Sequence, residues 1–368
     1  MDEEDIMNVS VKGNEQITKL LNDWYQAMLQ QQVSKATTLK QEVDNEINNV
    51  ETDYNISLYH ALLNFRYTVL TDWVSIKEDS FDQVASFEIP TDKSLAYYYH
   101  FFKALHLRLI TNYTEAKEQF DKAETLLQYI VNPFEKAEFH YRLGEFYYHS
   151  YQHLKSIDCI RNAKEKFSKQ NGYEINLALC ENIYGLCCID LKQFELAEEA
   201  LNTALALFQK INHAKYILMV RNNLGLLYAN QNLSELALRH LSEVTKKSPN
   251  HFRALYLEAD ENLKLNHLNI AKPLIKKGLY ICNHLKNREY QYRFMILKEM
   301  NTNTDTLEKA VLEGITYFEK EKLFDCIEEY TDRLADKFYN ENNYEQASKY
   351  YRMSKEAQQK QREKGALK

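Results

Sequence analysis

In YRLGEFYYHSYQHLKSIDCIRNA, residues 141–163, small and apolar residues follow a glycine at fixed intervals. Counted from that glycine the intervals are 12, 16 and 19 residues, and three later segments repeat them. The four sets are Gly144, Ser156, Ile160 and Ala163; Gly185, Ala197, Leu201 and Ala204; Gly225, Ala237, Leu241 and Val244; and Ala259, Ala271, Ile275 and Gly278. Small residues at these intervals let two antiparallel helices pack closely, so each segment predicts a helical hairpin.

This spacing is typical of tetratricopeptide repeats. Gly144 and Gly185 lie 41 residues apart, which is longer than the usual ~34 of this class, so the helix ends or turns are extended. In such an array the first helix of each hairpin lines a concave face, which binds ligands more often than it performs chemistry. We therefore predict an all-α chain with a tetratricopeptide superhelix over residues 94–368.

The N-terminal part has helical periodicity without the repeat pattern. Apolar residues recur at intervals of three or four in three segments, 14–32, 34–50 and 55–73. Three helices of this length with short connections predict a three-helix bundle over residues 1–73. The following segment, 74–93, loses this periodicity and is rich in Ser and Asp, so we expect a linker there.

The composition favours a helical protein of the cytoplasm. The 368 residues include 8 Gly and 4 Pro, which are few turn formers for a β-rich fold. The 6 cysteines form no CxxC pair, and the N-terminus MDEEDIMNVS is acidic and unlike a signal peptide. We expect reduced cysteines, a cytoplasmic location and no membrane partner.

Charge is unevenly distributed along the chain. Residues 1–93 hold 17 acidic and 7 basic side chains, a net charge of −10, whereas the whole chain has −7. Proteins bind the phosphate backbone of nucleic acids through Lys and Arg. The acidic N-terminal part therefore argues against a DNA-binding head, and we expect no DNA partner.

The predicted concave face is acidic, aromatic and rich in side-chain amides. The positions estimated from the repeats include Tyr148, Asn182, Asp190, Asn222, Asn223 and Asp260. Carboxylates suit a cationic side chain, and side-chain amides can pair with the backbone of an extended peptide. We interpret these residues as a binding site for a short, linear, basic peptide; the alternative is that they are ordinary solvated polar residues of a helical array.

The sequence contains no motif of a catalytic or metal site. It has no glycine-rich phosphate loop, no HExxH and no paired Cys–His spacing. His149 and His153 stand four residues apart, as a metal pair would, but without a nearby carboxylate. We expect no metal site and no cofactor on this chain, so any catalysis would depend on groups of a partner.

Three short sequences connect the chain with a known family. They are Asn22-Asp23-Trp24-Tyr25, the run LYHALLNFR at 58–66, and Glu135-Lys136-Ala137-Glu138-Phe139 ahead of Tyr147-Tyr148. With the order of bundle, linker and elongated repeats, they resemble the Rap proteins of Bacillus and its relatives. The resemblance implies a bundle that binds a response regulator of the sporulation or competence type, and either dephosphorylates or sequesters it. It also implies inhibition by a secreted and re-imported Phr pentapeptide.

The resemblance assigns roles to individual residues. Asp190 matches the acidic position that engages the peptide, and Asn223 matches the asparagine that holds the peptide backbone. Phe65 matches an apolar contact with the response regulator. These assignments agree with the concave face and bundle predicted from the residues themselves.

The resemblance also locates the catalytic position of the phosphatase members, at Tyr54. Those members carry a glutamine there, which orients the water that attacks the aspartyl phosphate. A phenol is a poor replacement for an amide that must accept and donate in one plane. Asn55 supplies an amide if the turn shifts by one residue, and Asp53 completes this candidate catalytic set.

The sequence leaves open both the mechanism of the chain and its class of function. The chain either hydrolyses the aspartyl phosphate, with Mg²⁺ expected only on the partner, or sequesters the partner. The alternative from a different class is a tetratricopeptide scaffold that joins proteins without catalysis or a small peptide ligand.

Overall fold

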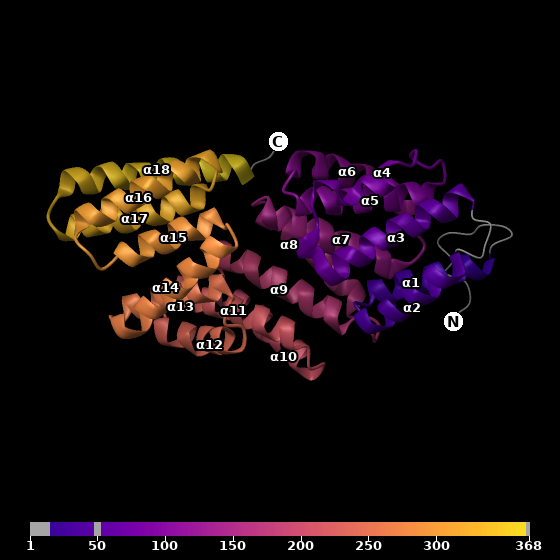
Figure 1. The fold of residues 1–368 in the computed structure, drawn as a ribbon, viewed down its shortest axis with the longest axis horizontal. Coiled ribbons are helices and arrows are strands. Elements are labelled where there is room, and N and C mark those ends of the chain that lie inside the picture. The colour runs from indigo at the N-terminus through magenta and orange to yellow at the C-terminus, as the bar shows by residue number, and fades with distance from the viewer. Residues whose placement is uncertain (1–14, 48–52, 366–368) are drawn as a thin grey trace. The chain divides into compact units, whose positions relative to one another are not determined.

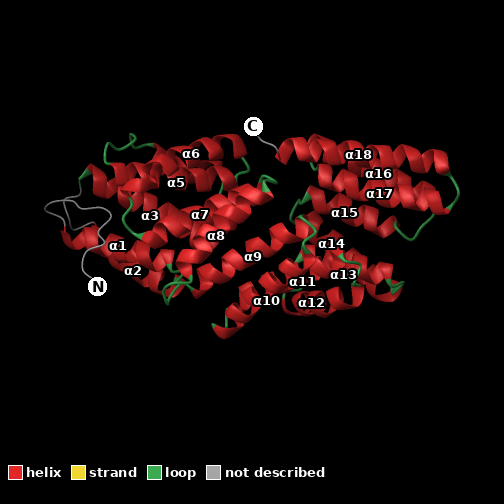
Figure 2. Cartoon of the chain, turned by 180° about the vertical axis from the view of Figure 1, so that it is seen from behind, coloured by secondary structure: helices red, strands yellow, loops and turns green. Residues whose placement is uncertain are grey.

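The computed structural model describes residues 15–47 and 53–365, which form helices joined by loops and turns (Figure 2). The described residues form eighteen α-helices and no strand, which confirms the all-α prediction. The chain divides into two compact units, residues 1–149 with 153–187, and residues 150–152 with 188–368. The division falls inside one helix, α9 (Glu174–Asp190). No described helix combines the length and apolar character needed to span a bilayer.

The first unit begins with a bundle of three helices. They are α1 (Glu15–Leu29), α2 (Val33–Glu46) and α3 (Tyr54–Asp72) (Figure 1). α1 buries Leu21, Trp24 and Met28, whose spacing of three and four residues places them on one helical face. α2 buries only Ala36 and Val43, so α1 and α3 provide most of the bundle core.

Residues 74–93, predicted as a linker, are packed. They contain η3 (Glu78–Phe81) and α4 (Asp82–Ala85), after the turn η2 (Trp73–Ser75). Phe81 and Val84 are 3% and 1% exposed and belong to the core of the first unit. The sequence did not reveal this because two isolated apolar residues in a polar segment produce no period.

The bundle and the first repeats of the first unit share one core. The hairpins are α5 (Lys93–Leu109) with α6 (Tyr113–Leu126), and α7 (Pro133–His149) with α8 (His153–Phe167). One apolar cluster extends from Ile17 in α1 to Phe146 in α7. The predicted boundaries at residues 73 and 93 are therefore not boundaries between compact units.

After α9 and α10 (Phe194–Lys210), the remaining helices of the chain form four further hairpins. They are α11 (Ala214–Asn230) with α12 (Ser234–Lys247), α13 (Phe252–Lys264) with α14 (Leu268–His284), α15 (Arg288–Glu299) with α16 (Thr304–Lys320), and α17 (Phe324–Asn340) with α18 (Tyr344–Gly365). A Cβ on Gly225 would lie 2.5 Å from Leu241, which shows why the pattern requires a small residue. The pattern is lost in the hairpin of α15 and α16. There Gly314, on the second helix, is the small residue that allows close packing, against Ile296 of the first helix.

Short turns join these helices with hardly any glycine. Asn212, Asn232, Asn266 and Asn342 have φ between 54° and 61°, the left-handed region that asparagine tolerates better than most residues. The amide after each turn donates back to the preceding helix, as from Leu233 N to Tyr228 O at 2.9 Å. These turns make neighbouring helices antiparallel and so produce the hairpins.

Candidate functional site

The start of α3 holds the predicted catalytic set. Asp53 accepts a hydrogen bond from the Ile56 amide at 2.9 Å and caps the helix. Tyr54 is 47% exposed, and its hydroxyl donates to the Glu88 carbonyl oxygen at 2.8 Å. Its ring meets Phe87 edge-on, with centroids 5.5 Å apart. Of these three residues only Asn55, which is half-buried, has a side-chain amide.

The predicted response-regulator contact, Phe65, lies in the core of the first unit. It is 5% exposed and packs edge-on against Phe81, with ring centroids 5.0 Å apart. Phe81 also stacks on His106, which binds the Lys77 carbonyl oxygen through Nε2 at 2.8 Å. A partner reaches Phe65 only if segment 78–85 moves, so this contact stays a prediction.

A buried ion pair joins the bundle to the repeats. Arg66 of α3 and Glu138 of α7 lie 2.5 Å apart, with side chains 0% and 1% exposed. Arg66 Nε and Nη1 and Glu138 Oε2 have no hydrogen-bond partner among the described residues. The sequence analysis missed the role of Arg66, because its partner lies 72 residues away.

Two predicted peptide contacts belong to the first unit. Tyr148 is half-buried, with its ring centroid 5.2 Å from His149 and 5.9 Å from His153. Asn182 on α9 is 4% exposed. Within the described parts of the chain, no three His, Cys, Asp or Glu side chains are grouped to hold a metal ion.

Three predicted contacts lie in the second unit near amide and carboxylate groups. Asn222 donates through Nδ2 to Asn223 Oδ1 at 3.4 Å, and its own Oδ1 is buried with no partner among the described residues. A buried amide oxygen normally accepts a hydrogen bond, so Asn222 suits a ligand N–H. Removal from water and then the carboxylate of Asp325 raise the pKa of Asp190 to about 7.

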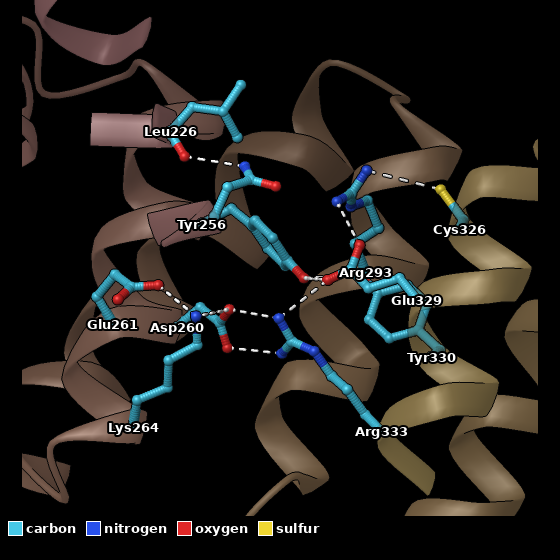
Figure 3. A network of polar contacts seen from close by, with 11 residues as sticks. Leu226, Tyr256, Asp260, Glu261, Lys264, Arg293, Cys326, Glu329, Tyr330 and Arg333 are labelled. Carbon is cyan, nitrogen blue, oxygen red and sulfur yellow. Dashed lines mark hydrogen bonds and ion pairs between the residues drawn. The ribbon is translucent and has the colours of Figure 1, made fainter. Parts of the chain in front are cut away.

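Asp260, the sixth predicted contact, is already paired within the chain. Both of its carboxylate oxygens accept hydrogen bonds from Arg333, at 2.8 and 2.7 Å (Figure 3). Burial acts to raise the pKa of Asp260, but Arg333 holds it below the ordinary value. A peptide cation therefore competes with Arg333 for this carboxylate.

Arg333 is part of a network across the first helices of three hairpins, α13, α15 and α17. Arg293 of α15 lies over the rings of Tyr256 and Tyr290, 4.8 and 5.1 Å from their centroids. The hydroxyls of Tyr256 and Tyr330 are 2.7 Å apart. The sequence analysis missed this network; the local signals were three pairs of opposite charge spaced four residues apart, Asp260–Lys264, Glu289–Arg293 and Glu329–Arg333.

Comparison with known proteins gives consistent matches. Residues 11–72 match the family model described as response regulator aspartate phosphatase H, N terminal. Response regulator aspartate phosphatase I of Bacillus subtilis (strain 168) is 27% identical over 356 residues, covering 94% of this chain and 91% of that protein. Response regulator aspartate phosphatase H of the same strain is 26% identical over 353 residues, covering 92% of this chain and 94% of that protein.

Solved structures have the same fold. The apo form of RapI has a TM-score of 0.70 at 26% identity, covering 94% of this chain and 98% of RapI. A Rap protein complexed with competence and sporulation factor has a TM-score of 0.81 at 22% identity, covering 95% of this chain and 99% of that protein. The chain belongs to the Rap family.

Proposed function

We propose that this chain binds a bacterial response regulator through its N-terminal bundle and is inhibited by a short peptide bound to its repeats. The observation that carries this proposal is the extent of the similarity. Two relatives named as response regulator aspartate phosphatases align over more than nine-tenths of the chain, with bundle and repeats in the same order.

The peptide we propose is extended and basic. Asn222 offers a buried amide oxygen without a partner among the described residues, which suits a backbone N–H. Asp190 lies near a second carboxylate, Asp325, and a cationic side chain would relieve the repulsion between them. Asn223 lies beside Asn222 and is the residue we expect to hold the peptide backbone.

Sequestration of the partner is the mechanism that the start of α3 favours. Hydrolysis of an aspartyl phosphate needs a group that orients the attacking water, while the partner supplies Mg²⁺. The Tyr54 hydroxyl instead donates to the Glu88 carbonyl oxygen, which ties the end of the connecting segment to the start of α3. Only Asn55 retains an amide there, on a shorter side chain than glutamine.

The test follows the decay of a phosphorylated sporulation-type response regulator with wild-type protein, Tyr54→Gln and Tyr54→Phe. We expect binding without faster decay for the wild type, faster decay with Tyr54→Gln, and no gain with Tyr54→Phe, which loses the hydroxyl without adding an amide. Rapid decay with the wild type would refute sequestration and point to Asn55. Absence of binding to any response regulator would instead favour the scaffold function.

The same proposal places the chain in the cytoplasm, where response regulators act, and without a DNA partner. The net charge of −10 over residues 1–93 supports the absence of DNA binding. Retention of labelled duplex DNA by the purified chain at low ionic strength would contradict it.

A further inference from the structure

Two arginines from different helices converge on one carboxylate in the second unit (Figure 3). Arg293 Nη2 on α15 lies 3.1 Å from Glu329 Oε2, and Arg333 Nη2 on α17 lies 3.1 Å from Glu329 Oε1. Each guanidinium therefore takes one oxygen of the same carboxylate. Paired N–H donors of this kind are the usual way in which proteins bind a carboxylate.

Both arginines have contacts that fix them independently of Glu329. Arg333 is held by the bidentate contact with Asp260, which in turn lies 3.7 Å from Lys264. The guanidinium of Arg293 lies over the rings of Tyr256 and Tyr290, and its side chain is 15% exposed. The positions of the two donors are thus set before any carboxylate arrives.

Glu329 is the least constrained member of the network. Its side chain is 30% exposed, whereas that of Asp260 is 7% exposed. Each arginine reaches it through a single N–H, and its other contact is a long one, 3.4 Å from the Tyr256 hydroxyl. Of the two carboxylates, the more exposed Glu329 is therefore the one that another carboxylate can displace.

We propose that Arg293 and Arg333 form a binding site for the C-terminal carboxylate of the peptide ligand, and that Glu329 occupies this site until the peptide displaces it. The inference rests on the proposed function and adds to it a chemical class, a ligand with a free carboxylate. Asp190 and the arginine pair then recognise opposite charges of one peptide.

The experiment measures the thermal unfolding of the full chain with pools of pentapeptides that contain one Arg or Lys among neutral residues. One pool has free C-terminal carboxylates and the other is amidated. A ligand selective for the folded protein raises the melting temperature. We expect the free-acid pool to stabilise the wild type, and the amidated pool to bind about tenfold more weakly, as loss of one charge-assisted contact predicts.

Substitution of Glu329 tests the proposed site more specifically than the comparison of the two pools. Glu329→Gln removes the internal competitor, so its affinity for the free-acid pool rises while that for the amidated pool does not. The matched control is Glu289→Gln, which removes another carboxylate near Arg293, at 3.4 Å, but not the one shared by both arginines. We expect no gain from the control. Melting without peptide shows that both variants fold.

Other outcomes distinguish a failure of the carboxylate site from a failure of the proposed peptide binding. Equal stabilisation of the wild type by both pools would overturn the carboxylate site and leave peptide binding intact. No stabilisation by either pool would overturn the inference and the peptide part of the proposed function together. If an amidated pool with one added Glu acts like the free-acid pool, the assignment to the C-terminus is wrong, because a side chain supplies the carboxylate.

Discussion

Two ionic clusters among the described residues, one in each unit, differ in burial and in how completely their polar atoms are paired. Arg66 and Glu138 of the first unit are 0% and 1% exposed, and three of their polar atoms lack a partner among the described residues. In the second unit, Arg333 and Glu329 are 29% and 30% exposed, and Asp260 has both carboxylate oxygens bonded. The first pair joins the bundle to the repeats, whereas the second cluster joins three repeat helices.

The contact of an ion pair with water determines whether it holds helices together or can exchange one partner for a ligand. A fully buried charge cannot lose its partner without a large penalty, because no solvent replaces it. A half-exposed charge can exchange its partner, because water and a ligand both reach it. We therefore assign cohesion to Arg66–Glu138 and ligand exchange to Glu329.

The largest expected effect comes from breaking the buried pair. Glu138→Met leaves Arg66 buried and unpaired, and Arg66→Met leaves the buried Glu138 with only Arg142 nearby, at 3.6 Å; we expect each change to cost about 3–5 kcal/mol of unfolding free energy. Urea unfolding measures this loss. The double variant Arg66→Met with Glu138→Met should recover most of it, because no unpaired charge remains. Single variants within about 1 kcal/mol of the wild type would show that the pair is not buried in solution.

A smaller effect is expected in the second unit from Arg333→Met. Asp260 then loses two charge-assisted hydrogen bonds and keeps Lys264 nearby, so we expect a loss of about 1.5–3 kcal/mol. The pKa of Asp260 is lowered in the folded state, so Arg333 stabilises above the ordinary Asp pKa of about 4. The difference between variant and wild type should shrink as the pH falls below that value. Arg352→Met is the control and should change little, because Arg352 is 83% exposed and its partner Glu356 is 56% exposed.

The pH dependence of the second unit sharpens the comparison further. The pKa of Asp190 is raised to about 7 in the folded protein, so its protonated form is favoured there. Its contribution to stability therefore falls as the pH rises from about 4 to about 7. Asp190→Asn, which cannot ionise beside Asp325, should melt higher than the wild type at pH 8 and nearly the same at pH 4. A constant difference at all pH values would contradict the assignment.

The smallest effect is expected at the surface of the first unit. Tyr54→Phe removes one hydrogen bond to the Glu88 carbonyl oxygen at a half-exposed position, so we expect a loss of about 0.5–1 kcal/mol. The ring contact with Phe87 remains. Hydrogen exchange at residues 86–90 should increase in this variant; unchanged exchange would show that the hydroxyl does not hold the segment.

The residues of the connecting segment show where sequence reasoning failed. Phe81 and Val84 appear as isolated apolar residues in a polar stretch, so the sequence predicted a linker. Both are buried, and Phe81 covers Phe65, because α3 and α5 offer an apolar surface that local periodicity does not reveal. Asp260 was predicted as a peptide contact, and the sequence did not reveal that its carboxylate is paired with Arg333.

The helices, their pairing into hairpins and the amide and carboxylate positions on the first helix of each repeat can all be predicted from local sequence patterns. These follow from intervals of three, four and twelve residues, which act within a helix or between neighbours. Which charges pair depends on the packing of distant helices, since Arg66 lies 72 residues from Glu138 and Arg333 lies 73 residues from Asp260 along the chain. Spacing along the chain does not predict these ion pairs, because they depend on how helices that are distant in sequence pack against one another.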